Sequence, residues 1–443
     1  MRRTGRLAAA LILSAAWGTT SPGAARTPHE PQKARAQKSE LREDPLAALL
    51  RQAEEAVGKK DYAAAAQALE SYLAERPEDA VGHFQLGYAY SGLQRDDDAK
   101  AEYSKAIALN PKLAAAHLNL GLTLLEREPA VAVEPLRQAA ELLPDQKRPR
   151  FLLGMALERS GKLASAIEQY ELARDLDPKD FEIRFALGRA LLRAERAAEA
   201  EVQFREALAL RADSAPARLG LADSLLAQEK LENAAEELRA YLRLQPQDQD
   251  ARLHLASLLA SLKKSDQALE ELDRYDRAAQ PSLASYKLRA QIYSDQKQWP
   301  QAAQVLQKAL QVAPQDAELH ALLGRLWLEK RDFPSAEREL RLALEADPLL
   351  TDALRDLAAV YYLAQKYQAA LDAFDLLARR EAPTSGSWFV RATCYDRLEK
   401  KAEALAAYEK FLEMDQGRND TQDFQARQRI RILKRELEQK KKR

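Results

Sequence analysis

Five histidines are the side chains in this 443-residue sequence best suited to bind a metal or transfer a proton near neutral pH. They are His29, His83, His117, His254 and His320. A metal-binding pair on one helix needs a second ligand three or four residues farther along, and none of the five histidines is followed by one at that distance. The sequence therefore predicts structural histidines and no metal site.

Other catalytic side chains occur without the spacing that catalysis needs. The sequence contains no HExxH, GxSxG, GxGxxG or P-loop motif. Acid pairs such as Glu236–Glu237 and Glu270–Glu271 lie on polar helix faces, whereas a carboxylate acid–base pair needs one buried member with a shifted pKa. Cys394 is the only cysteine and lies in an apolar helical pattern, which is typical of a buried thiol. We predict no catalytic residue, no cofactor and no enzymatic activity.

The composition indicates an all-α protein. Only 15 residues are glycine, although strand-rich and βαβ folds need glycine at tight turns. Long runs of Ala, Leu, Glu, Gln and Arg favour helix instead. Lys and Arg together number 68, as do Asp and Glu, so the net charge is zero. No nucleic-acid partner is expected, because a nucleic-acid-binding protein is usually strongly basic.

Residues 1–25 have the order of a secretory signal peptide. Three arginines precede an apolar run, Leu7–Trp17, which is shorter than the roughly 20 residues that span a bilayer. Small residues follow at Gly23, Ala24 and Ala25. We predict cleavage and a periplasmic or secreted protein, with an uncleaved N-terminal anchor as the alternative. Residues 26–45 form a polar, proline-containing linker, and no transmembrane span is expected in the mature chain.

The remaining chain repeats one unit. Two segments, from Ala80 and from Ala317, place the same residue types at the same offsets, and a small residue recurs every 34 positions from Gly188 to Ala392. Prolines such as Pro111 and Pro348 close many units. Self-similarity at this period is typical of stacked helix pairs. The units start near residues 46, 80, 114, 147, 181, 215, 249, 283, 317, 351 and 385, and they fill residues 46–418.

This pattern resembles the tetratricopeptide repeat (TPR) family, in particular its exported bacterial members. The shared positions in one unit are His83, Leu86, Gly87, Tyr90, Ala99, Tyr103, Ala106 and Pro111. The resemblance implies an α-α superhelical solenoid of about eleven helix pairs. Small residues at two of these positions allow the paired helices to approach closely, and large residues fill the space beside them. The third unit is one residue short before Ala132, which predicts a tightened turn.

A capping helix is expected after the last unit, because the end of a solenoid otherwise exposes an apolar flank. Residues 419–443 provide a capping helix and a basic tail, with helically spaced Phe424, Ile430, Leu433 and Leu437. The basic run from Arg427 is a solvated helix face in one interpretation. In the other it binds an acidic partner or anionic lipid headgroups.

The resemblance also implies a binding surface. In this family the first helix of each pair lines a concave groove, and fixed positions of that helix face the partner. In this sequence several of these positions hold aromatic, Met or Arg residues, which are the types enriched at protein interfaces. An alternative is that the phenylalanines only pack against neighbouring helices. The predicted partner-binding residues are Phe84, Gln85, Tyr88, Asn119, Arg148, Phe151, Met155, Phe185 and Arg189.

Two functions fit these expectations. The first is a non-catalytic scaffold or adaptor in the cell envelope that binds a protein or peptide segment in the groove, with Arg148 and Arg189 contacting carboxylates or carbonyls. The alternative is a helper in the export or assembly of a cell-envelope polysaccharide. Some family members grip a C-terminal carboxylate with Lys and Asn. Here Phe84 and Tyr88 occupy those two positions, which disfavours that mode of binding.

Overall fold

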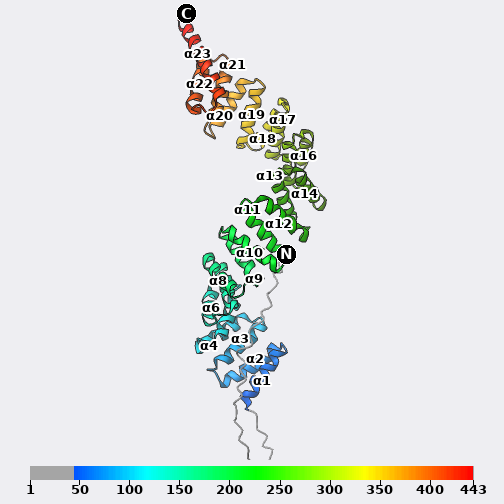
Figure 1. Cartoon of the computed structure of the whole chain (residues 1–443), viewed down its shortest axis with the longest axis vertical. Coiled ribbons are helices and arrows are strands. Elements are labelled where there is room, and N and C mark those ends of the chain that lie inside the picture. The colour runs from blue at the N-terminus through cyan, green and yellow to red at the C-terminus, as the bar shows by residue number, and fades with distance from the viewer. Residues whose placement is uncertain (1–43, 443) are drawn as a thin grey trace, which may run out of the picture. The chain divides into compact units, whose positions relative to one another are not determined.

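The computed structural model describes residues 44–442, and within this range it contains twenty-three helices and no strand (Figure 1). The predicted signal peptide and residues 26–43 of the predicted linker lie outside the described residues. Twenty-two of the helices form eleven pairs, and α23 (Asp420–Lys442) follows the last pair. The expected all-α solenoid of helix pairs with a C-terminal capping helix is therefore confirmed.

The first helices of the pairs start in step with the repeat period. They are α1 (Pro45–Gly58), α3 (Ala80–Gly92), α5 (Ala114–Leu124), α7 (Lys147–Arg159), α9 (Phe181–Arg193), α11 (Ala215–Leu226), α13 (Gln249–Ser261), α15 (Leu283–Asp295), α17 (Ala317–Glu329), α19 (Thr351–Leu363) and α21 (Ser385–Arg397). The second helices are α2 (Tyr62–Glu75), α4 (Asp96–Leu109), α6 (Pro129–Leu142), α8 (Leu163–Leu176), α10 (Ala197–Leu210), α12 (Leu231–Leu244), α14 (Ser265–Ala278), α16 (Trp299–Val312), α18 (Phe333–Ala346), α20 (Tyr367–Ala378) and α22 (Lys401–Asp415).

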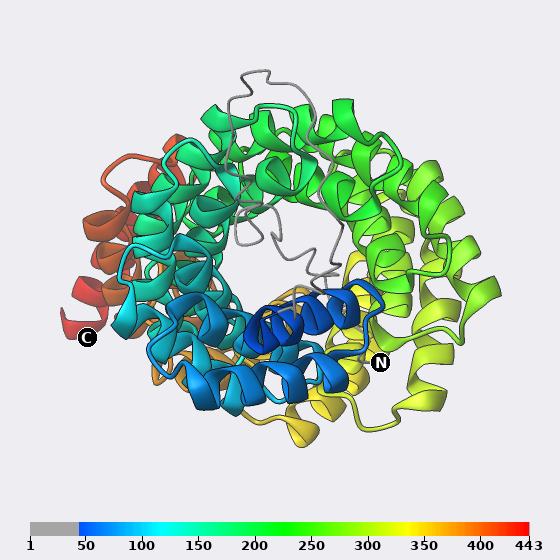
Figure 2. The same cartoon turned by 90° about the horizontal axis from the view of Figure 1, so that it is seen from below.

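The chain divides into two compact units, unit 1 up to Leu244 and unit 2 from Gln245. In each unit a second helix packs between its own first helix and the first helix of the next pair. First helices also contact one another, as α3 does α5 in unit 1 and α17 does α19 in unit 2. Because the odd-numbered helices converge, they form the concave side of each unit. In Figure 2, α1 (darkest blue) lies on the inner side of unit 1 and α2 on its outer side.

Small residues bring the helices of a pair together. Ala99 and Ala106 are completely buried, as is the aromatic ring of Tyr103 between them. A Cβ atom added at Gly87 would approach Tyr103 to 2.8 Å, which is closer than side chains tolerate. The small residue at this position of the unit therefore makes room for the large residue of the second helix.

Nearly every turn within a pair contains one residue in the left-handed region. In ten pairs this residue occupies the same position of the unit, and it is a glycine only once, at Gly161 with φ of +81°. The third pair differs, since no residue between Leu125 and Glu128 has a positive φ. Its connection is one residue shorter, and the amide of Glu128 donates to the carbonyl of Leu124 at 2.8 Å. The residue that this connection lacks is therefore the one that has a positive φ in the other ten pairs.

A recurring polar contact joins neighbouring pairs. Arg252 of α13 donates to the carbonyl of Pro246, which lies in the preceding connection, at 2.7 Å, and to Glu271 of α14 at 2.9 Å. We call this three-part contact a latch. It ties a connection to both helices of the following pair, with a basic side chain, Arg or His, at position four of the repeat unit. Equivalent latches are formed by His83, Arg184, Arg218 and His320.

Two junctions in unit 2 are built differently. The α14–α15 and α20–α21 connections each place a proline before a Ser or Thr N-cap, at Ser282 and Thr384. Arg289 of α15 binds Asp273 of α14 at 2.7 Å, and Arg391 of α21 binds Asp375 of α20. Both ion pairs join position seven of one repeat to position 25 of the repeat before it. We call these connections variant junctions.

The capping helix α23 contacts α22 through Ala426, Ile430 and Leu433, which are buried. Phe424 was expected on this face but lies on another, with 64% of its surface exposed. The helix therefore has two apolar faces, because Ile432, also exposed, lies on the same side as Phe424. Phe424 lies two residues before Ala426, and side chains two positions apart on a helix do not share a face. Phe424 therefore points away from α22.

Candidate partner-binding surface

The predicted surface is most open on helices α7 and α9 of unit 1. On α9, Phe181, Phe185, Arg189 and Arg193 are spaced four residues apart, so they lie on one face of the helix. On α7 the corresponding face carries Phe151, Met155 and Arg159. These seven residues, on two neighbouring first helices of the concave side, form what we call the α7–α9 face.

The aromatic part of this face rests on the second helices beneath it. Phe151 lies 5.8 Å from Tyr170 of α8, and Phe185 lies 6.0 Å from Phe204 of α10, measured between ring centroids. Phe181 and Phe185 stack in parallel, 5.8 Å apart. Phe151 and Phe185 nevertheless remain partly exposed. They therefore pack internally and also present one side to solvent.

The charged part of the face is organised by one buried carboxylate. Glu158 of α7, with only 6% of its side chain exposed, accepts hydrogen bonds from Arg193 at 2.7 Å and from Arg189 at 3.1 Å. The Tyr170 hydroxyl donates to the same carboxylate at 2.8 Å. Burial, together with this carboxylate, raises the pKa of Tyr170, so the phenol stays neutral. Arg189 and Arg193 are about half exposed, at 54% and 55%.

Four of the predicted residues lie nearer the start of unit 1 and are buried: Phe84, Gln85, Tyr88 and Asn119. Phe84 packs on Tyr103 at 6.0 Å, and Tyr88 packs edge-on against Tyr62 at 6.2 Å. The Gln85 Oε1 atom is buried and accepts no hydrogen bond from the described residues. The structure therefore separates these four from the accessible members of the set, which are Phe151, Met155, Phe185 and Arg189, with Arg148 also partly exposed. Partner contact at all nine remains a prediction.

Sequence reasoning missed several members of the face. Arg159 and Arg193 occupy position thirteen of their units, which faces the same side as position nine. Their positions were available from the repeat register. The central role of Glu158 was not, because only the folded pair shows that it lies under two arginines from the next pair.

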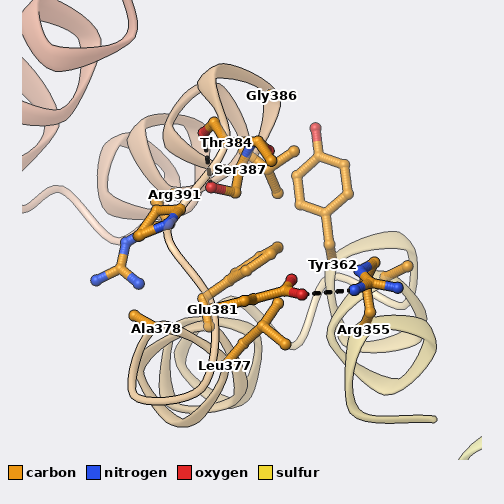
Figure 3. A pocket seen from close by; sticks show the side chains of 13 residues that line it. Arg355, Tyr362, Leu377, Ala378, Glu381, Thr384, Gly386, Ser387 and Arg391 are labelled. Atoms are coloured by element: carbon orange, nitrogen blue, oxygen red, sulfur yellow. Dashed lines mark hydrogen bonds and ion pairs between the residues drawn. The ribbon is translucent and has the colours of Figure 1, made fainter. Parts of the chain in front are cut away.

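Unit 2 contains a cavity of about 270 Å³ at the α20–α21 variant junction (Figure 3). Tyr362, Phe374 and Val390 supply much of its apolar lining. At one side Arg355 donates to Glu381 at 2.7 Å, and Arg355 also binds Asp352. This volume suits one large apolar side chain. The sequence did not indicate the cavity, because it depends on how far the altered connection separates α20 from α21.

A wider cleft of about 840 Å³ lies between α21, α22 and the capping helix. Its aromatic lining includes Phe389, Tyr408 and the exposed Phe424. The charged groups of the cleft are largely paired, as Arg429 is with Asp396 at 2.5 Å. The second apolar face of α23 therefore lines this cleft.

Three of the five histidines, His83, His117 and His320, have structural partners, and His29 lies outside the described residues. His83 contacts Glu102 at 2.5 Å and the carbonyl of Pro77 at 2.9 Å, and His320 makes the equivalent pair of contacts. Cys394 is completely buried, and burial raises the pKa of its thiol to about 11. No group of three or more metal-ligating side chains occurs among residues 44–442. No helix in this same range is long and apolar enough to cross a membrane.

Paired helices that stack through their second helices and line a concave face with their first define a helical-repeat protein. Sequence profiles described as tetratricopeptide repeat match residues 80–113, 126–216, 219–282, 293–349, 328–386 and 385–418. Together these matches cover most of the folded chain. The protein belongs to the tetratricopeptide repeat family, whose repeats bind proteins or peptides.

Solved structures with a similar fold are low in sequence identity. YrrB, described as a TPR protein with an unusual peptide-binding site, is 24% identical, with 42% of this chain and 96% of that chain covered and a TM-score of 0.40. Yeast Tom70 is 14% identical, with 89% and 96% covered and a TM-score of 0.37. MamA (41-end) from Desulfovibrio magneticus RS-1 is 22% identical, with 39% and 97% covered and a TM-score of 0.37. No protein with a curated description matches the sequence.

Proposed function

We propose that this protein is a non-catalytic scaffold or adaptor that binds a segment of another protein on the concave side of unit 1. The α7–α9 face carries this proposal. It combines half-buried aromatic rings, a methionine and half-exposed arginines, which are the residue types enriched at protein interfaces. The rings and Glu158 are fixed from below, so a partner meets a surface that is already ordered.

We further propose that the protein acts in the cell envelope. The order of residues in 1–25, with arginines, an apolar run and small residues, supports export. The mature chain is then expected to begin after Ala25. Mass spectrometry of the protein from an envelope fraction tests this. A full-length N-terminus in the envelope fraction supports the uncleaved anchor instead of cleavage. Recovery only from the cytoplasm contradicts the export proposal and leaves the binding proposal intact.

Site-specific crosslinking tests the binding function. A photoreactive residue at Met155, within the α7–α9 face, is expected to crosslink a discrete protein in cells that express the chain. A photoreactive residue at Val202 is the matched control, because Val202 is 53% exposed on the outer helix α10 of the same unit. Protein adducts at Val202 alone, or at neither position, contradict the proposal. A glycan adduct at Met155 supports the polysaccharide alternative instead.

A further inference from the structure

The α7–α9 face changes in character along its helices. The rings of Phe151 and Phe185 lie in the first half of α7 and α9, and Arg159, Arg189 and Arg193 lie in the second half. We propose that this face recognises an acidic protein segment, which places an apolar side chain on the rings and internal Asp or Glu side chains on the arginines. This inference rests on the proposed binding function and specifies the chemistry of the partner.

The charges at this end of the face do not balance. Glu158 is the carboxylate that binds Arg189 and Arg193. Arg159 donates to the carbonyl of Leu125 at 3.1 Å, and a carbonyl offsets no charge. Tyr170 is neutral and lies within electrostatic range of Arg159 and Arg189. Two guanidinium groups therefore share one carboxylate, and Arg159 adds a third positive charge near Tyr170, which leaves a local surplus of two positive charges.

The arginine at position nine of α9 does not recur in the next pair. One pair farther along the chain, the position equivalent to Arg189 is Asp223 of α11. An acidic partner is attracted to the arginines between α7 and α9. The acidic part of a partner is therefore expected to bind between α7 and α9.

The arginines still have hydrogen bonds to donate. A guanidinium has five N–H donors, and Arg193 uses one of its terminal nitrogens on Glu158. Since Glu158 is buried and fixed by Tyr170, it holds both arginines in place while about half of each side chain faces solvent. Little side-chain freedom remains to be lost when a partner carboxylate binds.

The spacing on α9 sets the spacing on the partner. From Phe185, Arg189 and Arg193 are four and eight residues away, which at a rise of 1.5 Å per residue is roughly 6 to 12 Å. An extended peptide covers this distance in about two to four residues. The expected motif is thus an apolar residue with acidic residues two to four positions away. Because these are side-chain carboxylates, a free C-terminus is not required.

Labelled peptides and the full chain provide the test. The probe is an acetylated and amidated peptide with one Phe, Glu at two and four positions from it, and Ser elsewhere, and its companion has Lys in place of Glu. By fluorescence anisotropy, the Glu peptide is expected to bind at least about tenfold more tightly than the Lys peptide, with a smaller difference at higher salt.

Three variants separate the charge effect from a general loss of structure. Arg159→Gln is expected to weaken binding of the Glu peptide about fivefold, and Glu158→Gln, which adds to the positive surplus, to strengthen it. Arg205→Gln is the matched control: Arg205 is 50% exposed and paired with Glu201 at 2.9 Å, but lies on the outer helix α10, so no change is expected.

Equal binding of the two peptides, or unchanged binding by Arg159→Gln, overturns the acidic-segment inference. If Met155 still crosslinks a protein in cells, the scaffold function stands and only its proposed chemistry fails. If the crosslink at Met155 is also absent, both proposals fail.

Discussion

At the scale of single residues, the most consequential side chains are the basic residues at position four of the repeat unit. In most family members this position packs an aromatic ring, but here it holds Arg in four middle units and His in three. The structure explains the exchange for Arg252. Its guanidinium satisfies the carbonyl of Pro246 and pairs with Glu271, whose side chain is only 7% exposed. The latch thus replaces a packing contact with a polar one that uses both terminal nitrogens of Arg252, while its Nε atom is buried without a hydrogen-bond partner among the described residues.

Breaking one latch is expected to destabilise the fold. Arg252→Met leaves Glu271 with Arg274 as its remaining ion-pair partner and leaves the Pro246 carbonyl without the guanidinium, so the free energy of unfolding should fall by about 3 kcal/mol. The double variant Arg252→Met/Glu271→Leu should recover part of this loss, because no buried carboxylate remains. Urea titration followed by circular dichroism measures both changes.

Arg277→Met is the control for this experiment. Arg277 is exposed on α14 and donates only to the carbonyl of Asp273 in its own helix, so its loss should change stability by no more than about 0.5 kcal/mol. Equal losses for Arg252→Met and Arg277→Met would show that the latch carries no particular stability.

At the scale of elements, the turn within each pair imposes the strictest backbone requirement. One residue per turn adopts a positive φ, and in nine of the ten turns concerned it is Lys, Gln, Glu or Arg instead of glycine. Such a conformation is costly for a residue with a Cβ atom. The contacts of both helices in the pair must therefore outweigh this cost at each turn.

Gly161 is the exception and permits a direct measurement. Its φ is +81°, and an added Cβ would meet no atom within 4 Å, so Gly161→Ala should lower the free energy of unfolding by about 1 kcal/mol through backbone strain alone. Gly58→Ala has equally open surroundings but lies at the end of helix α1, and it should instead raise stability by roughly 0.5 kcal/mol. Changes of the same sign in both variants would contradict this explanation.

The sequence predicted the helices better than the cavities and buried contacts between neighbouring helix pairs. The period of 34 residues and the recurring small residues were sufficient to predict eleven helix pairs, because packing at Gly87 and Ala99 depends on local residue types. The cavity beside Tyr362 and the buried position of Glu158 depend on the separation and rotation of neighbouring pairs. Phe424 was placed wrongly for a related reason, since helical spacing alone fits two different faces of α23.

At the scale of the whole molecule, several titrating groups act in the same direction at alkaline pH. Burial raises the pKa of Cys394 to about 11. The hydrogen bond to Asp79 raises the pKa of Tyr72 to about 12, and burial with a hydrogen bond to Glu70 raises the pKa of Tyr90 to about 12. Each group is protonated more readily in the folded chain than in the unfolded chain, whose values are about 9 for Cys and about 10 for Tyr.

The resulting stability is complete below the unfolded pKa values and is lost as pH rises through the folded ones. We therefore expect the melting temperature to fall steadily from about pH 9 to about pH 12. The double variant Tyr72→Phe/Tyr90→Phe removes two of the groups and should show a shallower fall above about pH 10. Thermal unfolding at a series of pH values measures this. An unchanged slope in the double variant would mean that the tyrosines do not contribute.

The latches also determine how local unfolding spreads along the chain. When one helix pair unfolds, the arginine of the next pair loses the carbonyl that accepts its hydrogen bond. Neighbouring pairs therefore tend to unfold and refold together. At the two variant junctions the tie is an ion pair between helices instead. Unit 2 therefore contains two junctions without a latch, and local unfolding that begins on one side of such a junction can stop there and leave the other side folded.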